Sequence, residues 1–449
     1  MRVTSSYLRE LSRLALPMGL QMLIFTSSTT IDAIMVGQLG DHELGAVGLA
    51  DRAMFLFAMI TVGAANASGT LGAQQLGSGN LSAFKRSIAS GMLVSGCLGL
   101  LSALTFLLFS RFIVGLGTSD PTVIELGSNY LRIVGVTMAS AGILLPLEVG
   151  LRCIKRAGVA TQYSFVEAIV NFLLNYCLIF GKWGCPELGV EGAALGTLIA
   201  RLVHVILLVA HIWLWEPRLV ITRSDIHQAA LPARLRSYNA ISGPLIINHL
   251  IWGAGVFAFQ LLYGRMGTSA LAAMTVIWTF QRLVLVQLAA VGHAGAVLVG
   301  HAIGAGDVHG ARRASWQNLT VALCISALIS LLLVMFRDEA VGAFRGLDEA
   351  TVGLIYAAFP VLLIEALFRA ITVSVIVGGL KAGGDVRFAL YLDLGGAWFI
   401  GLPLAAMGAF VFGQPLPVVY ALAICEEASK SVIALIRLSG SKWMHRLAD

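Results

Sequence analysis

The chain has 449 residues, of which 58% are hydrophobic and 12% charged, and its mean hydropathy is +0.85. About a quarter of the residues of a soluble domain are charged, so this composition excludes a soluble globular protein. The net charge of +6 fits a membrane protein whose cytoplasmic loops collect Lys and Arg, and it requires no nucleic-acid partner.

Apolar runs of about 20 residues, the length that crosses a hydrocarbon core of roughly 30 Å, recur along the chain. They predict an all-α integral membrane protein with twelve transmembrane helices. The first run continues past signal-peptide length and has no A-x-A cleavage site, so we expect a retained helix. The predicted helices cover 11–37, 44–72, 84–110, 122–147, 159–182, 189–215, 235–264, 270–300, 311–336, 350–379, 387–412 and 416–438.

The loops between these helices are short except for one, which divides the chain. We predict an N-lobe at 1–215, a cytoplasmic linker at 216–234 and a C-lobe at 235–449. With the N-terminus inside, one side of the membrane carries nineteen Lys and Arg residues and the other carries five. Because positive charge collects in the cytoplasm, we expect both termini there, with the protein in the inner (plasma) membrane.

A repeat is visible when the chain is shifted by 227 residues. The register holds without a gap for about seventy residues, and later it drifts, so that "DPTV" (120–123) meets "EATV" (349–352). Two six-helix halves that enter the membrane from the same side are parallel repeats, which are typical of transporters with alternating access to a cavity between the halves. The aligned residues include Pro17 and Pro244, Gly40 and Gly267, Gly79 and Gly306, and Lys85-Arg86 and Arg312-Arg313.

The segments "IDAIMVGQLG" (31–40), "ELGAVGLA" (43–50), "LGVEGAALGT" (188–197) and "GGDVRF" (383–388) occur in this order. Together with the helix count and the repeat, they resemble the multidrug and toxic compound extrusion (MATE) family over nearly the whole chain. The segment 420–443 is similar to a bacterial branch of that family. The resemblance implies two six-helix bundles around a V-shaped cavity, and drug export by a rocker-switch antiporter driven by Na⁺ or H⁺.

Asp32 is a carboxylate inside the first predicted helix, in a stretch rich in small and hydroxylated residues. A charge within a membrane costs at least about 2.5 kcal/mol at the helix centre, so it usually faces a cavity and has a function. The repeat places Phe259 at the equivalent position, so the second half lacks this acid. The alternative is that Asp32 only bonds neighbouring Ser or Thr hydroxyls and holds helices together.

The resemblance also implies partners for Asp32 in an N-lobe cation site. Asn171 and Asn175 lie four residues apart on one face of the fifth helix, and Thr197 ends the motif of the sixth. Asn175 stands where the family has a second carboxylate. These oxygen ligands suit Na⁺, yet a lone carboxylate in a low-dielectric pocket also takes up a proton. We lean towards H⁺ as the coupling ion, and Na⁺ stays open.

Other charges fall inside the predicted C-lobe helices. Glu365 and Arg369 are four residues apart and are expected to pair on one helix face, as structural partners or as part of a substrate or proton site. Glu426 and Lys430 have the same spacing, which leaves Glu427 without a partner on this helix, and Asp393 completes a predicted polar network. Other intramembrane charges include Glu148 and Arg152, expected as an interfacial pair, and Arg132, Glu167, Arg201 and Arg282, whose partners the sequence does not assign.

The seventh helix contains "NHLIW" (248–252), where some relatives carry a glutamate for coupling or substrate binding. Asn248 and His249 are therefore candidates, since a histidine titrates between pH 5 and 8. Aromatic residues that either line a cavity for flat organic cations or face lipid are Phe25, Trp252, Phe259, Trp278 and Phe280. Pro17 is expected to bend the first helix, and the resemblance links such a bend to ion binding.

We therefore expect a monomeric exporter of small drugs or toxic organic cations, embedded in the lipid bilayer, with no cofactor besides its coupling ion. A flippase for a lipid-linked precursor is the alternative, because Arg282 and Arg369 leave room for pyrophosphate recognition. No H-E-x-x-H, G-x-S-x-G or usable acidic pair occurs, and no P-loop, so we expect neither an enzyme nor direct drive by ATP.

Overall fold

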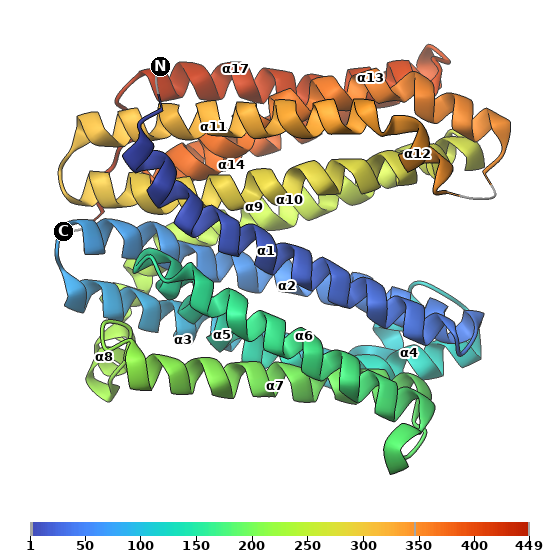
Figure 1. Cartoon of the computed structure of the whole chain (residues 1–449), viewed down its shortest axis with the longest axis horizontal. Coiled ribbons are helices and arrows are strands. Elements are labelled where there is room, and N and C mark those ends of the chain that lie inside the picture. Colours follow the sequence, from blue (N-terminus) through green and yellow to red (C-terminus); the bar gives the residue numbers. More distant parts are fainter. Residues whose placement is uncertain (1–2, 345–346, 448–449) are drawn as a thin grey trace. The chain divides into compact units, whose positions relative to one another are not determined.

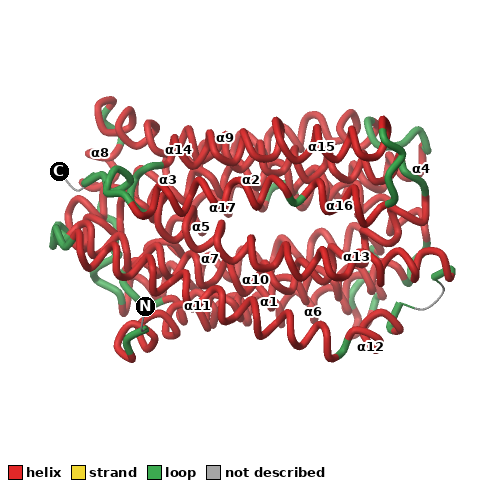
Figure 2. The backbone as a smooth tube through the Cα atoms, turned by 90° about the horizontal axis from the view of Figure 1, so that it is seen from above, coloured by secondary structure: helices red, strands yellow, loops and turns green. Residues whose placement is uncertain are grey.

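The computed structural model describes residues 3–344 and 347–447. Helix runs along nearly all of these residues (Figure 2). Among them, ten helices are long and apolar enough to cross a membrane. The pair α4 (Pro121–Val134) and α5 (Thr137–Cys153), bent by 41°, meets the same test of length and composition when the two helices are taken together, which makes up to eleven spans. The predicted twelfth span corresponds to α16 (Leu416–Ala423) and α17 (Cys425–Ser439), which meet at a break after Ala423.

The chain divides into two compact units. The N-terminal unit is Leu16–His249, and the C-terminal unit is Met1–Ala15 together with Leu250–Asp449. Both units therefore contain part of α1 (Ser5–Gly37) and part of α9 (Pro232–Arg265). The predicted lobes at 1–215 and 235–449 follow the helix count instead and stay a prediction.

In the N-terminal unit, helices pack against neighbours along the chain and against more distant helices, such as α3 (Leu81–Gly115) against α5. α2 (Asp41–Gly77) lies against α3, and α6 (Ala157–Phe180) runs beside α7 (Gly189–Trp215) (Figure 1). A short 3₁₀ turn, η1 (Lys182–Gly184), joins these last two helices. The start of α9 is fixed here too, because Tyr238 donates its hydroxyl hydrogen to the Ala64 carbonyl at 2.7 Å.

The predicted linker contains a short helix, α8 (Arg223–Ala229), that packs against α3. Thr222 and Asp225 cap its start reciprocally, with the two backbone N–H groups donating across at 2.9 and 3.2 Å. Burial acts to raise the pKa of Asp225, but the bonds from Thr222 and the charges of Lys85 and Arg86 hold that pKa below its ordinary value. The linker is thus a folded element of the N-terminal unit.

The C-terminal unit is built from α10 to α17. The start of α1 belongs to it, because Gln317 Nε2 donates to Thr4 Oγ1 at 3.3 Å and Tyr7 packs on an apolar cluster that includes Trp443. The last helices contain π-helical segments, which are wide turns found most often near functional sites. The elements are α10 (Thr268–Gly304), α11 (Val308–Met335), α12 (Arg337–Gly342), α13 (Glu349–Thr372), η2 (Val373–Lys381), α14 (Val386–Leu394), η3 (Gly395–Gly401), α15 (Leu402–Ala406) and η4 (Met407–Val411).

The repeat is confirmed in backbone conformation. Gly79 and Gly306, which the 227-residue shift aligns, have φ angles of 78° and 80°. This left-handed conformation suits glycine. The next residues, Asn80 and Asp307, cap α3 and α11, each accepting a backbone hydrogen bond from the third residue of its helix, at 3.0 and 2.7 Å. Two loops with the same turn and cap therefore introduce equivalent helices.

Further along the chain the caps refine the register of the repeat. Asp120 caps α4 and Asp348 caps α13 through side-chain bonds of 2.8 and 3.1 Å to backbone N–H groups. Cap therefore meets cap at a shift of 228 residues. The expected alignment of "DPTV" with "EATV" instead pairs Thr122 with Thr351, whose backbone N–H groups make these two bonds.

Candidate functional site

Asp32 of α1 is bonded to the helix that the sequence predicts. Asn175 Nδ2 of α6 donates to Asp32 Oδ1 at 2.7 Å, and Asn175 is fully buried. The hydroxyls of Thr29 and Thr30 instead donate to the Thr26 carbonyl, at 2.9 and 2.8 Å. The partner of Asp32 is therefore an amide of another helix and not a neighbouring Ser or Thr hydroxyl, and this bond joins α1 to α6.

Asn171 extends this site by one helical turn. Its Nδ2 donates to Thr197 Oγ1 of α7 at 3.2 Å, and its Oδ1 accepts from Ser28 Oγ of α1 at 3.3 Å. Asn175 Nδ2 also lies 3.5 Å from Asn171 Oδ1. The structure thus brings together the four predicted residues, Asp32, Asn171, Asn175 and Thr197, from three helices.

Glycines of the "GVEGAALGT" motif allow α7 to approach α6 this closely. A Cβ added at Gly196 would lie 2.1 Å from Asn175 Oδ1, and one at Gly192 would lie 2.4 Å from the Leu178 carbonyl oxygen. Asn175 Oδ1 is buried and has no hydrogen-bond partner among the described residues. The amide therefore presents its donor to Asp32 and its unpaired acceptor to Gly196.

A second acid lies near this site and escaped the sequence analysis. Asp51 of α2 is an electrostatic neighbour of Asp32, and it is paired with the hydroxyl of Tyr130 on α4. Tyr130 is buried, while Asp51 is exposed. The sequence pattern that singled out Asp32 also applies to Asp51, which is a carboxylate inside the predicted span 44–72.

The predicted pair at the end of the fourth span is confirmed. Arg152 Nη2 lies 3.6 Å from Glu148 Oε2. Gln21 of α1 joins this pair, because its Nε2 donates to Glu148 Oε1 at 2.8 Å and its Oε1 accepts from Arg152 at 3.3 Å. Thr161 holds the same helix four residues earlier by donating to the Pro17 carbonyl at 2.8 Å.

Partners of the unassigned charges also lie within the N-terminal unit. Arg201 Nε is 3.1 Å from Glu167 Oε1, and buried His204 places Nδ1 at 2.6 Å from Glu167 Oε2. Arg132 donates through Nε to Ser110 Oγ at 3.1 Å. Each of these contacts joins two helices, so spacing along one helix does not predict it. Spacing shows only that Arg201 and His204 share a face of α7.

The C-terminal unit contains a cavity of about 260 Å³. Its lining includes the aromatic residues Trp252, Phe259 and Trp278 and charged side chains such as Glu365 and Arg369. Arg282 lines the cavity as well, and it has no hydrogen-bond or ion-pair partner among the described residues. A flat organic cation is suited to aromatic faces beside carboxylates.

Two of the predicted aromatic residues lie elsewhere. Phe280 is buried in the apolar core of the C-terminal unit, and Phe25 is exposed on the N-terminal unit. Asn248 and His249 belong to the N-terminal unit and are absent from the described lining of this cavity. His249 instead contacts Asn66 Nδ2 through Nε2 at 3.3 Å and the Leu245 carbonyl through Nδ1 at 2.8 Å.

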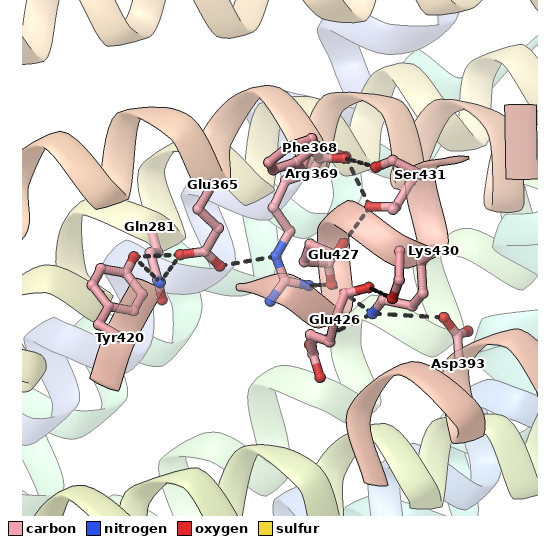
Figure 3. Close-up of polar contacts among 12 residues, drawn as sticks. Gln281, Glu365, Phe368, Arg369, Asp393, Tyr420, Glu426, Glu427, Lys430 and Ser431 are labelled. Carbon is pink, nitrogen blue, oxygen red and sulfur yellow. Dashed lines mark hydrogen bonds and ion pairs between the residues drawn. The ribbon is translucent and has the colours of Figure 1, made fainter. Parts of the chain in front are cut away.

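Figure 3 shows the ion pairs beside the cavity. The predicted pair Glu365 and Arg369 is confirmed at 3.2 Å, and Glu426 and Lys430 at 3.5 Å. The expectation that Glu427 is left over is wrong: its Oε1 lies 2.6 Å from Lys430 Nζ and 2.9 Å from Arg369 Nη1. Lys430 lies three residues after Glu427 on α17, and Arg369 reaches Glu427 from α13.

The remaining members surround these pairs. Asp393, predicted as part of the network, lies 4.0 Å from Lys430 Nζ and 3.7 Å from Lys381 Nζ. Gln281 and Tyr420 both donate to Glu365 Oε2 (Figure 3). Lys381, Gln281 and Tyr420 were missed in the sequence, where nothing distinguishes them from other polar residues near helix ends or in apolar runs.

The comparisons with known proteins agree with this architecture. A model of the MatE family matches residues 17–177 and 244–407. A "Probable multidrug resistance protein NorM" of Rhizobium meliloti is 29% identical over 88% of this chain and 85% of its own length. The "Multidrug resistance protein PmpM" of Pseudomonas aeruginosa is 28% identical over 88% and 83%.

Among solved structures, one described as "Crystal structure of MATE in complex with MaL6" matches with a TM-score of 0.87 and 18% identity, over 96% of both chains. This likeness extends the fold to nearly the full length of the chain. Because the family model also covers most of the chain, in two segments that correspond to the two halves of the repeat, the chain belongs to the MatE family of membrane transporters.

Proposed function

We propose that this chain is a secondary active antiporter that exports amphipathic, cationic organic compounds in exchange for a coupling ion. Support comes from the multidrug resistance names of its relatives and from the cavity of the C-terminal unit. The observation that carries the proposal is the bond between Asp32 and Asn175. It places a carboxylate beside a neutral donor inside a membrane-spanning helix, where an ionisable residue most often marks a functional site.

The surroundings of Asp32 favour H⁺ as the coupling ion. Its partner Asn175 is neutral, and no Lys or Arg forms an ion pair with it among the described residues. A protonated Asp32 has a hydrogen to donate, and the buried Asn175 Oδ1 has none to accept. A half-turn of the amide would let Oδ1 accept from the protonated Asp32 and would break the contact between Asn175 Nδ2 and Asn171 Oδ1, so we propose that this amide responds to the presence of the proton.

Na⁺ is the second candidate. The site offers Asp32, Asn171, Asn175 and Thr197 as oxygen ligands, of which one is charged. In the arrangement present here, two of these ligands are engaged with each other, since Asn171 donates to Thr197. Asn171 Oδ1 already faces α1 and Asn175, so binding Na⁺ would require the Asn175 amide to turn its oxygen inward and Thr197 to give up the bond from Asn171.

Transport itself is proposed to follow alternating access of the rocker-switch kind, with substrate in the cavity and ion at Asp32. We further propose a monomer in the inner membrane with both termini in the cytoplasm. The flippase alternative has less support, because pyrophosphate needs several free cations. Arg369 is held by two carboxylates and Lys430 by three, so Arg282 alone stays free among the described lining residues.

The test is reconstitution of the purified protein in liposomes with a fluorescent cation such as ethidium. Imposed pH and Na⁺ gradients are applied separately to the wild type, Asp32→Asn and the control Asp41→Asn, which changes an exposed acid in the first turn of α2. We expect the pH gradient to drive transport, and Asp32→Asn to reduce it at least about 100-fold, or roughly 2.7 kcal/mol. Wild-type protein that moves no dye under either gradient would contradict the antiporter, and full activity of Asp32→Asn would contradict its site.

A further inference from the structure

A column of polar side chains runs along the helices of the N-terminal unit, away from the Asp32 site. On α6, Glu167 lies four residues before Asn171, on the same helix face. On α7, His204 lies seven residues after Thr197, again on one face. In the proposed topology α6 begins, and α7 ends, on the side that carries most of the Lys and Arg residues. The column therefore leads from Asp32 towards the cytoplasm.

One ring nitrogen of His204 is bonded to α6. The residue is 1% exposed, and its Nδ1 lies 2.6 Å from Glu167 Oε2. The other oxygen of Glu167, Oε1, lies 3.1 Å from Arg201 Nε, and this ion pair keeps the acid charged. An ionised carboxylate has no hydrogen to donate, so the hydrogen between the two groups belongs to Nδ1.

The other ring nitrogen of His204 has no donor to bond. Nε2 is buried without a hydrogen-bond partner among the described residues, and it faces Glu148 Oε1 at 3.8 Å. In a neutral ring whose hydrogen is on Nδ1, Nε2 is an acceptor, and so is a carboxylate oxygen. Nothing joins these two acceptors unless a proton lies between them. Glu148 is near the end of α5 at Cys153, so this position is close to the cytoplasmic end of its helix.

The charges that face His204 balance while its ring is neutral. Two acids and two arginines face it from the surrounding helices: Glu148 and Arg152 of α5, Glu167 of α6 and Arg201 of α7. From α1 comes only the neutral amide of Gln21, which donates to Glu148 Oε1 at 2.8 Å. A proton on Nε2 leaves this group with a positive charge in excess, which is costly in a low-dielectric environment. The ring can therefore take up a proton between two acids without holding it permanently.

The distance from this position to the Asp32 site is short. Asn171 and Glu167 are four residues apart on α6, a rise of about 6 Å. Asn171 is itself bonded to Ser28 of α1 and Thr197 of α7, and it lies one turn from Asn175, the partner of Asp32. Ordered water commonly joins polar groups over a gap of this kind.

We propose that His204 and Glu148 form a second proton site in the N-terminal unit, which receives the proton released by Asp32 and passes it to the cytoplasm. The O–H bond of Asp32 breaks, water carries the proton across the gap, and an N–H bond forms at His204 Nε2. This bond then breaks, and the proton leaves past Glu148 to cytoplasmic water, so the protein gains none over a cycle. The inference rests on the proposed function with H⁺ as the coupling ion, and it adds the route by which that ion enters the cell.

The experiment compares two kinds of transport by the purified full-length protein in liposomes. The first is ethidium movement driven by a pH gradient, which needs the release of a proton in every cycle. The second is exchange of ethidium for ethidium with no gradient, which the substrate-loaded form of an antiporter performs without proton transfer. A residue that only holds helices together affects both, whereas a residue that transfers protons affects the first.

His204→Gln keeps an amide that can donate to Glu167 but cannot carry a proton. We expect its gradient-driven transport to fall at least about tenfold, or roughly 1.4 kcal/mol, while its exchange matches the wild type. Heavy water should slow the gradient-driven transport of this variant more than that of the wild type, because proton transfer then limits the rate. His309→Gln, which changes an exposed histidine of α11, should match the wild type in all three measurements.

Gradient-driven transport by His204→Gln at the wild-type rate would overturn the inference. His204→Asn is measured beside it, in case the longer amide does not fit the site. Loss of exchange in both variants would assign His204 to helix packing and would overturn the inference as well.

The wild type separates this inference from the proposed function. Wild-type protein driven by a pH gradient, together with normal transport by His204→Gln, keeps the antiporter and loses only the route. Wild-type protein driven by a Na⁺ gradient alone keeps the antiporter and loses the proton site. Wild-type protein that moves no dye under either gradient loses the proposed function, and the inference with it.

Discussion

The two compact units stabilise the carboxylates inside their helices in different ways. In the N-terminal unit, Asp32 accepts a hydrogen bond from the neutral amide of Asn175. In the C-terminal unit, four carboxylates are held by three cations. The repeat makes this contrast sharp, because the position of Asp32 is taken by Phe259, which lines the cavity instead.

The contrast shows that one fold can contain both an acid suited to binding and releasing a proton and acids that form stable ion pairs. An acid with neutral partners changes its charge at little structural cost, because no cation is left behind when a proton binds. An acid paired with buried cations cannot do so, since the loss of its charge leaves those cations uncompensated.

The largest expected effect comes from removing the most heavily paired acid. Glu427→Gln leaves Arg369 and Lys430 short of a partner, so we expect a loss of stability of about 3–5 kcal/mol, the usual result of breaking a buried pair. Thermal or denaturant unfolding in detergent measures it, with Glu349→Gln as the control. Asp32→Asn should unfold like the wild type. Equal stability of all three variants would show that the ion pairs of Glu427 stabilise the protein no more than the hydrogen bond of Asp32 does.

An intermediate effect is expected where no acid is touched. In Gly196→Ala the new Cβ would lie 2.1 Å from Asn175 Oδ1, which forces the amide away from Asp32. We expect transport driven by a pH gradient to fall about tenfold, or roughly 1.4 kcal/mol. Gly158→Ala, on α6 where an added Cβ meets nothing within 4 Å, should transport normally. Equal rates in the two variants would show that the amide has no part in coupling.

The smallest effect is expected at the unpaired cation of the C-terminal unit. Arg282→Gln removes a positive charge from the cavity lining, so a cationic ligand should bind about three- to tenfold more tightly, a gain of about 1 kcal/mol that corresponds to charges roughly 4 Å apart in a water-filled cavity. Binding of tetraphenylphosphonium at low ionic strength measures it. Weaker binding by this variant would mean that Arg282 holds the ligand rather than repels it.

Much of the fold was predictable because membrane helices are encoded locally. The predicted 189–215 matches α7 at both ends, and the glycine turns and Asn or Asp caps near 79 and 306 repeat with the same spacing. The length of an apolar run and the presence of a capping residue are properties of one segment, so they can be predicted without knowing which helices pack against it.

Partners across helices were predictable only where a family resemblance supplied them. Spacing of four residues located the pair Glu365 and Arg369, but the contact of Arg369 with Glu427 depends on how α13 and α17 are rotated. Sequence spacing carries no such rotation. The pair of Glu427 with Lys430, three residues apart on α17, could have been predicted from spacing, and Asp51 from its place in an apolar run.

The starts of α1 and α9 are exchanged between the two units, and this has a consequence for cutting the chain. The linker helix α8 lies wholly within the N-terminal unit, so the chain passes from one unit to the other inside two continuous helices. A break in the linker therefore leaves intact both helices, α1 and α9, in which the chain passes from one unit to the other. Each resulting fragment would keep a helical segment that completes the other fragment's unit, and two halves produced separately should reassemble much as domain-swapped partners do.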